Sequence, residues 1–227
     1  MLYTEDMARM NIRTREGKRV FYLGKGDTLT PGARDWLNRE RIPILSASEA
    51  KPEEYRLLNG AVLREKPEHM THLHSNVLVW KTHPRIQFRG KMDALEAELL
   101  LCRLECPGWE KELGEILSLA RNLIRWEVLE EPAKQETLCG LTESELRSHS
   151  HRPQDFYGQA HFMPEAADGA AVLHLNRCRT AARAAELAAA EAFTDENGNC
   201  TRVDLLRLLN RMSSMLYILM IREKAKR

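Results

Sequence analysis

Three charged residues share one face of a predicted helix near residue 180. Arg179, Arg183 and Glu186 are separated by four and three residues, so a helix places their side chains on one side. Guanidinium groups match phosphate oxygens, and a carboxylate can bind the Mg²⁺ that accompanies phosphates. Their neighbours are small residues that leave room for a large ligand: Thr180, Ala181, Ala182, Ala184 and Ala185. A solvated ladder of salt bridges is the alternative, and the spacing alone does not choose between the two.

Three other polar residues lie on or at the start of apolar stripes. Asn210 breaks the stripe of the last predicted helix, and a buried amide must be hydrogen-bonded. It is therefore either a core amide satisfied by the protein or a group offered to a ligand. Asp93 and Glu96 are predicted in the first turn of their helix. Carboxylates there complement the helix dipole, which accounts for most such pairs.

The histidines raise the question of a metal site. Seven of the eight histidines raise it, namely His69, His72, His74, His83, His149, His151 and His161. Neither H-E-x-x-H nor paired C-x-x-C motifs accompany them. Cys102 and Cys106 lie one helical turn apart on an apolar stripe, which is typical of a core. Residues 195–206 imitate a calcium loop, but the glycine is misplaced and position twelve is Leu206, so we reject that site. A structural metal remains the alternative to plain packing.

The elements that must position these residues are helices from about residue 84 onward. Apolar spacing predicts helices over residues 93–106, 109–129 and 169–193, and a last helix from about 201 to 222. Thr142 and Glu145 form a capping box for a short helix between them. The last helix is apolar nearly all round, which places it centrally or at a subunit interface. Four or five helices with short connections predict an antiparallel bundle.

The first 65 residues have a different character. Residues 19–23 and 41–45 predict short strands, and Thr30 and Pro31 predict the start of a helix. Residues 49–68 are rich in Lys, Glu and Pro and are interpreted as a linker. The sequence therefore predicts a small α+β appendage over residues 1–65, followed by a helical-bundle domain over residues 66–227.

Length and composition exclude several classes of protein. A chain of 227 residues allows one large domain, or one domain with a small appendage. Its net charge of +1 excludes gross attraction to nucleic acid, so we expect no nucleic-acid partner. Five scattered cysteines argue against a disulfide framework. The longest apolar run, residues 215–221, is too short to span a bilayer, and no secretory signal begins the chain. We expect a soluble, cytoplasmic protein without a membrane partner.

Taken together, the segments resemble the cobalamin adenosyltransferases, and most closely the ethanolamine-utilisation branch. The resemblance rests on Lys66-Pro-Glu-His-Met-Thr-His-Leu73, Lys81-Thr-His-Pro-Arg85, Phe88-Arg-Gly-Lys-Met-Asp93-Ala-Leu-Glu96, Gly140-Leu-Thr-Glu-Ser-Glu-Leu146, Met163-Pro-Glu-Ala-Ala-Asp-Gly169, Arg179-Thr-x-x-Arg183-x-x-Glu186 and Leu209-Asn210-Arg211-Met-Ser213. Their order and spacing, more than any single motif, carry the resemblance over about residues 66–222. Residues 29–34 also resemble the N-terminal segment of that branch.

The resemblance implies a fold and an activity. The expected fold class is all-α, a five-helix bundle with the small α+β appendage, working as a homo-oligomer with active sites between subunits. The family transfers the 5′-deoxyadenosyl group of ATP to the cobalt of cob(I)alamin and releases inorganic triphosphate. ATP, Mg²⁺ and cobalamin as a substrate are thus implied. The ethanolamine branch adds association with a bacterial microcompartment as an option.

The resemblance also implies roles for individual residues. The residues that would cradle the triphosphate are the loop Thr71, His72 and Leu73, together with Lys81. Arg183 would contact phosphates, Glu186 would hold Mg²⁺ or the ribose, and Asn210 would bind the nucleotide. The group expected to act in catalysis is Arg183, Glu186 and Lys81.

Two further roles concern the corrinoid and the assembly. Phe162 lies near the family's aromatic residue that crowds the lower face of the corrin, where an apolar wedge would exclude the axial ligand and ease reduction of cobalt. Asp93 and Arg179 resemble the pair that joins neighbouring subunits beside the site.

The chain departs from the family pattern in three places. Residues 52–68 contain neither His nor Cys, so the transition-metal dependence of some members is not expected. Thr71-His72-Leu73 replaces a Thr-Gly-Asp loop, and Ala184 stands where many relatives have a second arginine. A catalytically silent bundle that serves as a corrinoid carrier or assembly partner is the alternative function. Binding of ATP separates the two hypotheses, because a scaffold has no reason to bind triphosphate.

Overall fold

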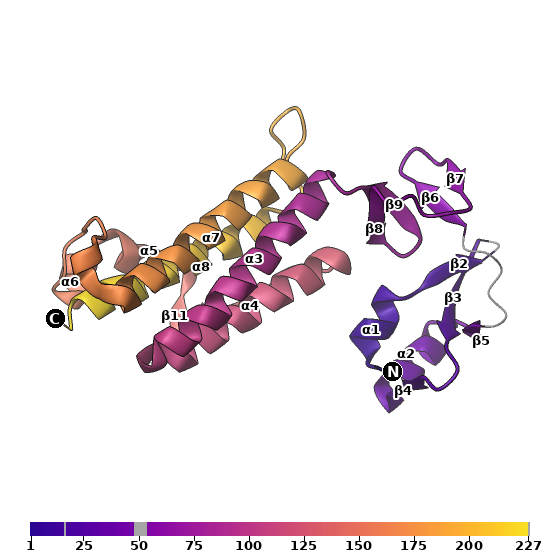
Figure 1. The fold of residues 1–227 in the computed structure, drawn as a ribbon, viewed down its shortest axis with the longest axis horizontal. Helices are drawn as coiled ribbons and strands as arrows, with labels where there is room; N and C mark the ends of the chain where they lie inside the picture. The colour runs from indigo at the N-terminus through magenta and orange to yellow at the C-terminus, as the bar shows by residue number, and fades with distance from the viewer. Residues whose placement is uncertain (16, 48–53, 227) are drawn as a thin grey trace. The chain divides into compact units, whose positions relative to one another are not determined.

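The structure is a computed structural model that describes residues 1–15, 17–47 and 54–226. The chain divides into two compact units, Met1–His83 and Pro84–Arg227 (Figure 1). The division predicted after residue 65 falls within the first of these units. That the catalytic domain extends over residues 66–227 stays a prediction.

The first half of the N-terminal unit is a small α+β core. Its elements are β1 (Leu2–Tyr3), α1 (Glu5–Met10), β2 (Arg13–Arg15), β3 (Lys18–Leu23), β4 (Thr28–Leu29), α2 (Pro31–Arg39) and β5 (Ile44–Ser46). Strands β2, β3 and β5 form one sheet in that order, and β1 pairs with β4. The Thr30 hydroxyl accepts from Ala33 N–H at 3.3 Å and begins α2, as predicted. Phe21 and Leu37 are fully buried between helices and sheet.

A four-stranded sheet occupies the segment that composition suggested was a linker. Its strands are β6 (Tyr55–Leu57), β7 (Val62–Leu63), β8 (Met70–His74) and β9 (Val77–Trp80), in the order β7-β6-β9-β8. The linker prediction is therefore wrong for residues 55–63, where β6 and β7 lie, and residues 48–53 lie outside the described residues. In β6 only alternate side chains, those of Tyr55 and Leu57, are half-buried, while the residue between them is exposed. The composition of the segment therefore stays polar, and the prediction failed for that reason.

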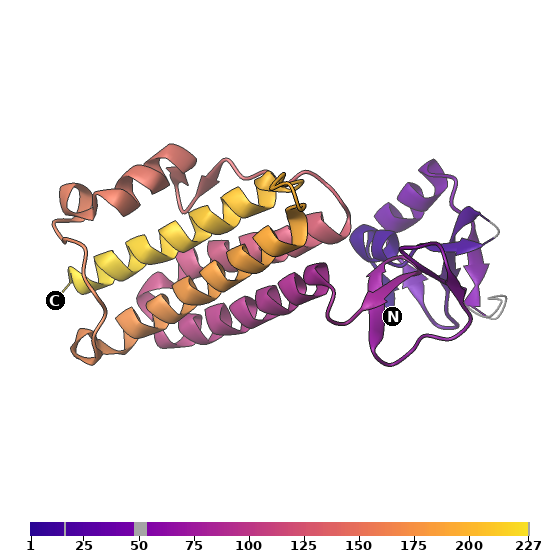
Figure 2. The same ribbon diagram turned by 90° about the horizontal axis from the view of Figure 1, so that it is seen from above.

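The second unit is built from helices. They are α3 (Pro84–Glu105), α4 (Glu110–Val128), α5 (Glu143–His151), α6 (Pro153–Tyr157), α7 (Gly169–Phe193) and α8 (Val203–Lys224). Figures 1 and 2 show α3, α4, α7 and α8 running alongside one another. A short hairpin, β10 (Thr137–Leu138) and β11 (Leu141–Thr142), precedes α5.

The predicted all-α class is wrong. The described residues form four sheets as well as eight α-helices, and one of these sheets, β10–β11, belongs to the helical unit. Helical periodicity repeats over several turns and dominates the sequence pattern, whereas strands of two to six residues leave almost no pattern. The correct description is a helix-rich chain with four small sheets.

Helix α3 begins well before the predicted residue. Its buried side chains, at spacings of four and three, are Phe88, Met92, Leu95, Leu99 and Cys102. The stripe thus starts upstream of Asp93, and Gly90 does not break it. Asp93 and Glu96 lie in the helix interior, so the first-turn dipole explanation is wrong for both.

Small residues on α7 serve packing. Ala182, Ala185 and Ala189 are fully buried where α7 meets α3 and α8, and side chains of this size allow close approach of helix backbones. Of the small neighbours of Arg183, Ala182 and Ala185 therefore leave no room for a ligand. Helix α8 buries residues on most of its circumference, which confirms a central place, the first of the two positions predicted for it. The Thr142–Glu145 capping box at the start of α5 is also confirmed.

Candidate active site on helices α7 and α8

Helix α7 presents its charged face without internal ion pairs. Arg183 is exposed, whereas Arg179 and Glu186 are half-buried. Among the residues that the structure describes, none of the three forms a salt bridge. The alternative of a salt-bridge ladder is therefore wrong, although the shared face that spacing predicted is present.

Asn210 joins this face from the neighbouring helix. Its Nδ2 donates to Glu186 Oε1 at 2.9 Å, and its Oδ1 accepts from the Arg211 guanidinium. The hydroxyls of Ser213 and Ser214 donate to its backbone oxygen at 2.9 and 3.0 Å. The amide is thus hydrogen-bonded, as expected, and it fixes one carboxylate oxygen of Glu186.

The guanidinium of Arg179 lies in a positive environment. Its Nε and Nη2 donate to Asn176 Oδ1 at 3.0 and 2.9 Å, and no carboxylate neutralises it in the described structure. Burial, followed by repulsion from Arg183, lowers the pKa of Arg179 below its usual value. A guanidinium remains charged under all ordinary conditions. The face therefore offers cationic donors to an anion.

A tyrosine–histidine pair extends the polar face toward the end of the bundle. His161 Nε2 lies 3.1 Å from the backbone oxygen of His151, which only accepts, so Nε2 carries a proton in this arrangement. In the neutral ring Nδ1 then accepts from the Tyr217 hydroxyl at 2.6 Å. Burial raises the pKa of Tyr217 and keeps that hydroxyl protonated. The pair ties the segment after α6 to α8.

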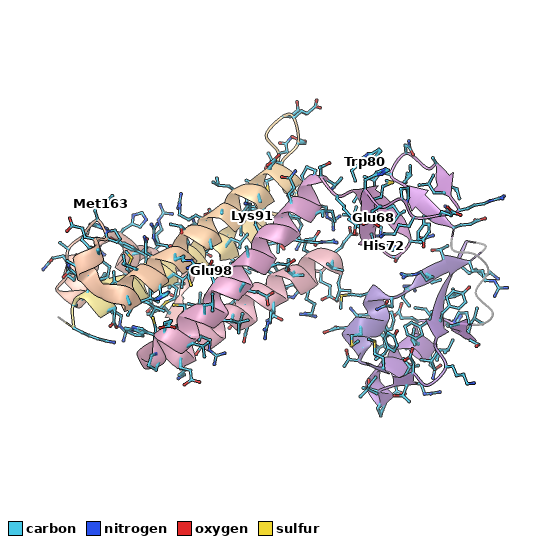
Figure 3. The ribbon with its side chains drawn as sticks, viewed as in Figure 1. Glu68, His72, Trp80, Lys91, Glu98 and Met163 are labelled. Carbon is cyan, nitrogen blue, oxygen red and sulfur yellow. The ribbon has the colours of Figure 1, made fainter. Side chains whose placement is uncertain are left out.

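Phe162 follows this histidine directly in the chain. It is half-buried, and the Lys224 ammonium lies 5.3 Å from its ring centroid. Lys224 also pairs with the buried carboxylate of Asp168. The next residue, Met163, is 85% exposed and points away from the bundle (Figure 3). An aromatic ring and a thioether are thus available side by side in sequence on one surface segment.

The remaining predicted ATP residues belong to the first unit. Thr71, His72 and Leu73 lie on strand β8, so the prediction that they form a loop is wrong. Leu73 is buried, and the His72 ring lies 5.7 Å from Tyr55. The Lys81 ammonium donates to Glu68 Oε1 at 2.9 Å (Figure 3 labels Glu68) and lowers the pKa of that carboxyl.

The predicted interface pair does not meet within one chain. Asp93 is exposed on α3 and makes no salt bridge with any described residue. Arg179 uses its donors on Asn176. The two side chains are thus not partners within the second unit.

A buried ion cluster escaped the sequence analysis. Glu127 on α4 is fully buried and accepts from Arg85 Nε at 2.6 Å and from Arg89 Nε at 2.7 Å. Arg85 also binds the exposed Glu130 at 3.2 Å. The signal for this cluster was present in the sequence, because Glu127 follows directly on the apolar stripe of α4.

The histidines have ring partners in place of a common metal. His69 stacks on Trp80 at 4.9 Å, and His149 Nδ1 lies 2.7 Å from the Tyr157 hydroxyl. Within residues 1–15, 17–47 and 54–226, no three His, Cys, Asp or Glu side chains are grouped so as to hold a metal ion. Cys102 and Cys106 are buried, as predicted for core residues.

The helices of the described chain are also too short or too polar to cross a bilayer.

Comparison with known proteins identifies the family. The family model described as cobalamin adenosyltransferase matches residues 61–223. The corrinoid adenosyltransferase EutT of Salmonella typhimurium is 31% identical over 98% of this chain and 92% of its own length. EutT of Escherichia coli K12 is 30% identical over 96% and 90% of the two chains. The corrinoid adenosyltransferase PduO of Salmonella typhimurium is 30% identical over 66% of this chain and 45% of its own. No solved structure matches the chain significantly. The chain therefore belongs to the cobalamin adenosyltransferase family, whose enzymes transfer an adenosyl group to a corrinoid.

Proposed function

We propose that this chain transfers the 5′-deoxyadenosyl group of ATP to cob(I)alamin, forming adenosylcobalamin and inorganic triphosphate for ethanolamine utilisation. Family membership over nearly the whole chain supports the adenosyl transfer. The observation that carries the residue assignment is the cationic face of α7, where Arg179 and Arg183 lack carboxylate partners in the described structure.

The chemistry requires alignment and charge stabilisation. Cobalt(I) attacks the 5′ carbon with its electron pair, the carbon–oxygen bond breaks, and the triphosphate leaves with that bond's electrons. The substrate supplies the nucleophile, so the protein's tasks are to align carbon with cobalt and to stabilise the negative charge on the leaving group. In this proposal Arg183 contacts that charge directly.

Glu186 is proposed to contact the Mg²⁺ that ATP carries. Asn210 occupies Glu186 Oε1, while the second oxygen has no hydrogen-bond partner among the described residues. A hard carboxylate oxygen fits Mg²⁺, which usually takes one or two protein carboxylates and completes its shell with phosphates and water. When bound, the ion would neutralise part of the triphosphate charge. Asn210 holds the carboxylate in place and, in this proposal, also contacts the nucleotide.

For the first unit we propose that Lys81 and the strand residues Thr71 and His72 bind triphosphate oxygens. The Lys81 ammonium is exposed, and its partner Glu68 is exposed as well, so the pair can open at small cost. Leu73 is buried in the sheet, and only its backbone could contribute to a phosphate site.

Phe162 is proposed to contact the lower face of the corrin and to exclude the axial ligand. Its half-buried ring lies at the surface segment that carries Met163. Replacement by alanine should raise the fraction of five-coordinate cob(II)alamin in the complex, because the axial ligand can then return to cobalt, and electron paramagnetic resonance measures this fraction. An unchanged fraction would remove Phe162 from this role.

Asp93 and Arg179 are proposed to pair between subunits of a homo-oligomer. The carboxylate of Asp93 on α3 is exposed and forms no salt bridge with a described residue, which supports this assignment. Asp93→Ala should then lower the mass measured by sedimentation at micromolar concentration. Unchanged mass and activity would rule out the role. We place the assembly in the cytoplasm, within a microcompartment where one is formed.

The deciding experiment is an anaerobic assay with ATP, Mg²⁺ and chemically reduced cob(I)alamin. We expect the cobalt(I) absorbance to decay only with protein, and triphosphate to appear in equal amount. Decay that begins only after Fe²⁺ or Zn²⁺ is added would favour metal dependence instead. An intact protein that binds no ATP would favour the corrinoid carrier or assembly partner.

A further inference from the structure

Trp80 differs from every other tryptophan of the chain. The chain has four tryptophans, and Trp36, Trp109 and Trp126 are at most 8% exposed. Trp80 is 58% exposed, although it ends an ordered strand. Keeping so much aromatic surface in water forgoes the stabilisation that its burial would give. The exposed indole is therefore available to a ligand.

His69 holds the indole in one orientation. The two rings are nearly parallel, with 4.9 Å between centroids and 18° between planes. The β8–β9 ladder sets Met70 opposite Trp80, and Lys81 N–H donates to the His69 oxygen at 3.0 Å. With one face of the indole against His69 and most of its area exposed, the other face is available to a second planar ring.

Packing within the sheet accounts for only part of the ring's contacts. Met70, directly opposite Trp80, is buried with 4% of its surface exposed. The stack on His69 and the neighbouring Met70 account for the portion of the indole that is shielded from water, and leave the exposed majority unexplained. A side chain that served only as a cover would bury its own ring as well.

Charged groups flank the stack. Lys81 follows Trp80 in the chain, and its ammonium lies 2.9 Å from Glu68, the residue before His69 (Figure 3). Lys66 also acts on this carboxylate. Two ammonium groups thus accompany one carboxylate beside the rings. An aromatic face with neighbouring cations is the combination that binds a base carrying phosphate.

We propose that Trp80, backed by His69, stacks on the heteroaromatic base of a ribose phosphate. This subsite rests on the proposed function, because both substrates carry such a group. ATP carries adenine, and cobalamin carries a benzimidazole base on the nucleotide tail below its corrin. Lys81 neutralises the phosphate attached to the bound base. The stack therefore selects ligands that contain a base over those that contain only phosphate or only corrin.

The test compares ligands with and without the base. We measure by calorimetry the affinities of the parent, Trp80→Ala and Trp80→Phe for Mg²⁺–ATP, inorganic triphosphate, cobalamin and cobinamide, which lacks the base. From ~1–3 kcal/mol per stacked base, Trp80→Ala should weaken the base-bearing ligand about 5-fold to 150-fold and change its base-free counterpart less than about twofold. Trp80→Phe should keep most of the affinity. Loss with ATP identifies adenine, and loss with cobalamin identifies benzimidazole.

A matched control and a direct probe accompany the affinities. The control variant is Leu58→Ala, because Leu58 is 64% exposed and lies in the same unit. This variant should bind all four ligands as the parent does. Trp80 should dominate the solvent-exposed part of the tryptophan emission. The base-bearing ligand should quench this emission in the parent but not in Trp80→Phe.

Two outcomes with Trp80→Ala overturn this proposal alone. One is parent-like affinity of Trp80→Ala for all four ligands. The other is an equal loss of affinity of Trp80→Ala for base-bearing and base-free ligands, which would show that the substitution acts through the fold or through charge and not through stacking. Failure of the proposed function is distinguishable, because it shows as a parent that forms no adenosylcobalamin, whatever Trp80 does. A parent that binds none of the four ligands overturns both proposals.

Discussion

Two groups of charged side chains in the helical unit are built in opposite ways. Around Glu127, a fully buried carboxylate accepts from two guanidiniums, and Arg85 also reaches Glu130 and a backbone oxygen. On the α7–α8 face, Arg179 and Arg183 have no carboxylate partner among described residues, and Arg183 is exposed. The first group is saturated with internal partners. The second keeps part of its hydrogen-bonding capacity, namely the Arg183 guanidinium and the second oxygen of Glu186, for something outside the chain.

This difference separates stability from function. A buried charge without its partner carries a large desolvation cost, so a saturated cluster contributes to the fold mainly by keeping every member paired. An exposed, unpaired arginine contributes little to folding and can be replaced without loss of stability. Substitutions in the two groups should thus change different measured quantities.

The largest effect on the fold is expected at Glu127. Glu127→Ala leaves Arg85 and Arg89 half-buried without their common carboxylate, and should lower the free energy of unfolding by ~3–5 kcal/mol. Urea denaturation measures this change. The matched control is Glu130→Ala, which removes an exposed carboxylate from the same cluster and should cost at most about 1 kcal/mol. Equal losses in the two variants would contradict the distinction.

The next effect is expected at Arg183, in activity alone. Arg183→Ala should lower kcat/KM about 100-fold to 1,000-fold, because it removes a donor to the developing triphosphate charge. The urea midpoint should stay at the parent value, since Arg183 has no ion pair with the described residues. The control is Arg121→Ala. It removes an exposed arginine of α4 that pairs with Glu96 of α3, and it should leave kcat/KM and the urea midpoint unchanged. Unfolding of Arg183→Ala would assign it to the structural group.

A smaller, pH-dependent effect is expected at Asp204. Its carboxylate accepts from Ala133 N–H at 2.7 Å and from Arg202 at 3.0 Å. Burial alone would raise the pKa of Asp204, but the bonds from Arg202 and Ala133 lower it below the usual value. The stabilisation is therefore complete above the unfolded pKa near ~4 and is lost as pH falls through the lower, folded pKa. Asp204→Asn should cost ~1.5–3 kcal/mol at pH 7. The difference from the parent should shrink below pH ~4; a pH-independent difference would contradict this account.

The smallest effect is expected at the start of α5. The Thr142 hydroxyl accepts from Glu145 N–H at 3.4 Å, and Glu145 accepts from Thr142 N–H at 2.8 Å. Thr142→Ala should lower the free energy of unfolding by ~1 kcal/mol, and Thr142→Ser should restore most of it. Thermal melting measures both. A loss of activity in folded Thr142→Ala would assign Thr142 to function as well as to stability.

Local features of the sequence were predicted well because they depend on near neighbours. Apolar spacing located α4, α7 and α8, and the caps at Thr30 and Thr142 are fixed by residues three positions away. The shared face of Arg179, Arg183 and Glu186 likewise follows from helical spacing. The roles assigned to these residues in binding ATP stay predictions.

Features that depend on distant partners were missed or misjudged. Arg85 and Glu127 lie 42 positions apart, so their pairing exists only in the folded bundle. Asn210 was recognised as unusual, but its partner Glu186 lies on another helix. Strand β6 pairs in parallel with β9 across a long connection, and neither strand has a strong pattern of its own. Trp80 is the last residue of an apolar strand, so the sequence pattern gives no sign that its ring is exposed. That exposure is visible only in the folded structure.

The exposure of Arg183 also bears on how fast an anion is captured. The chain's net charge is +1, so its field at long range is weak and does not guide ATP from a distance. Attraction begins only within a Debye length, ~8 Å at physiological ionic strength, where the arginines of α7 act locally. Association should thus depend on salt only through the last steps of approach. Such a surface binds anions through short-range contacts, and it does not attract the other polyanions of the cell from a distance.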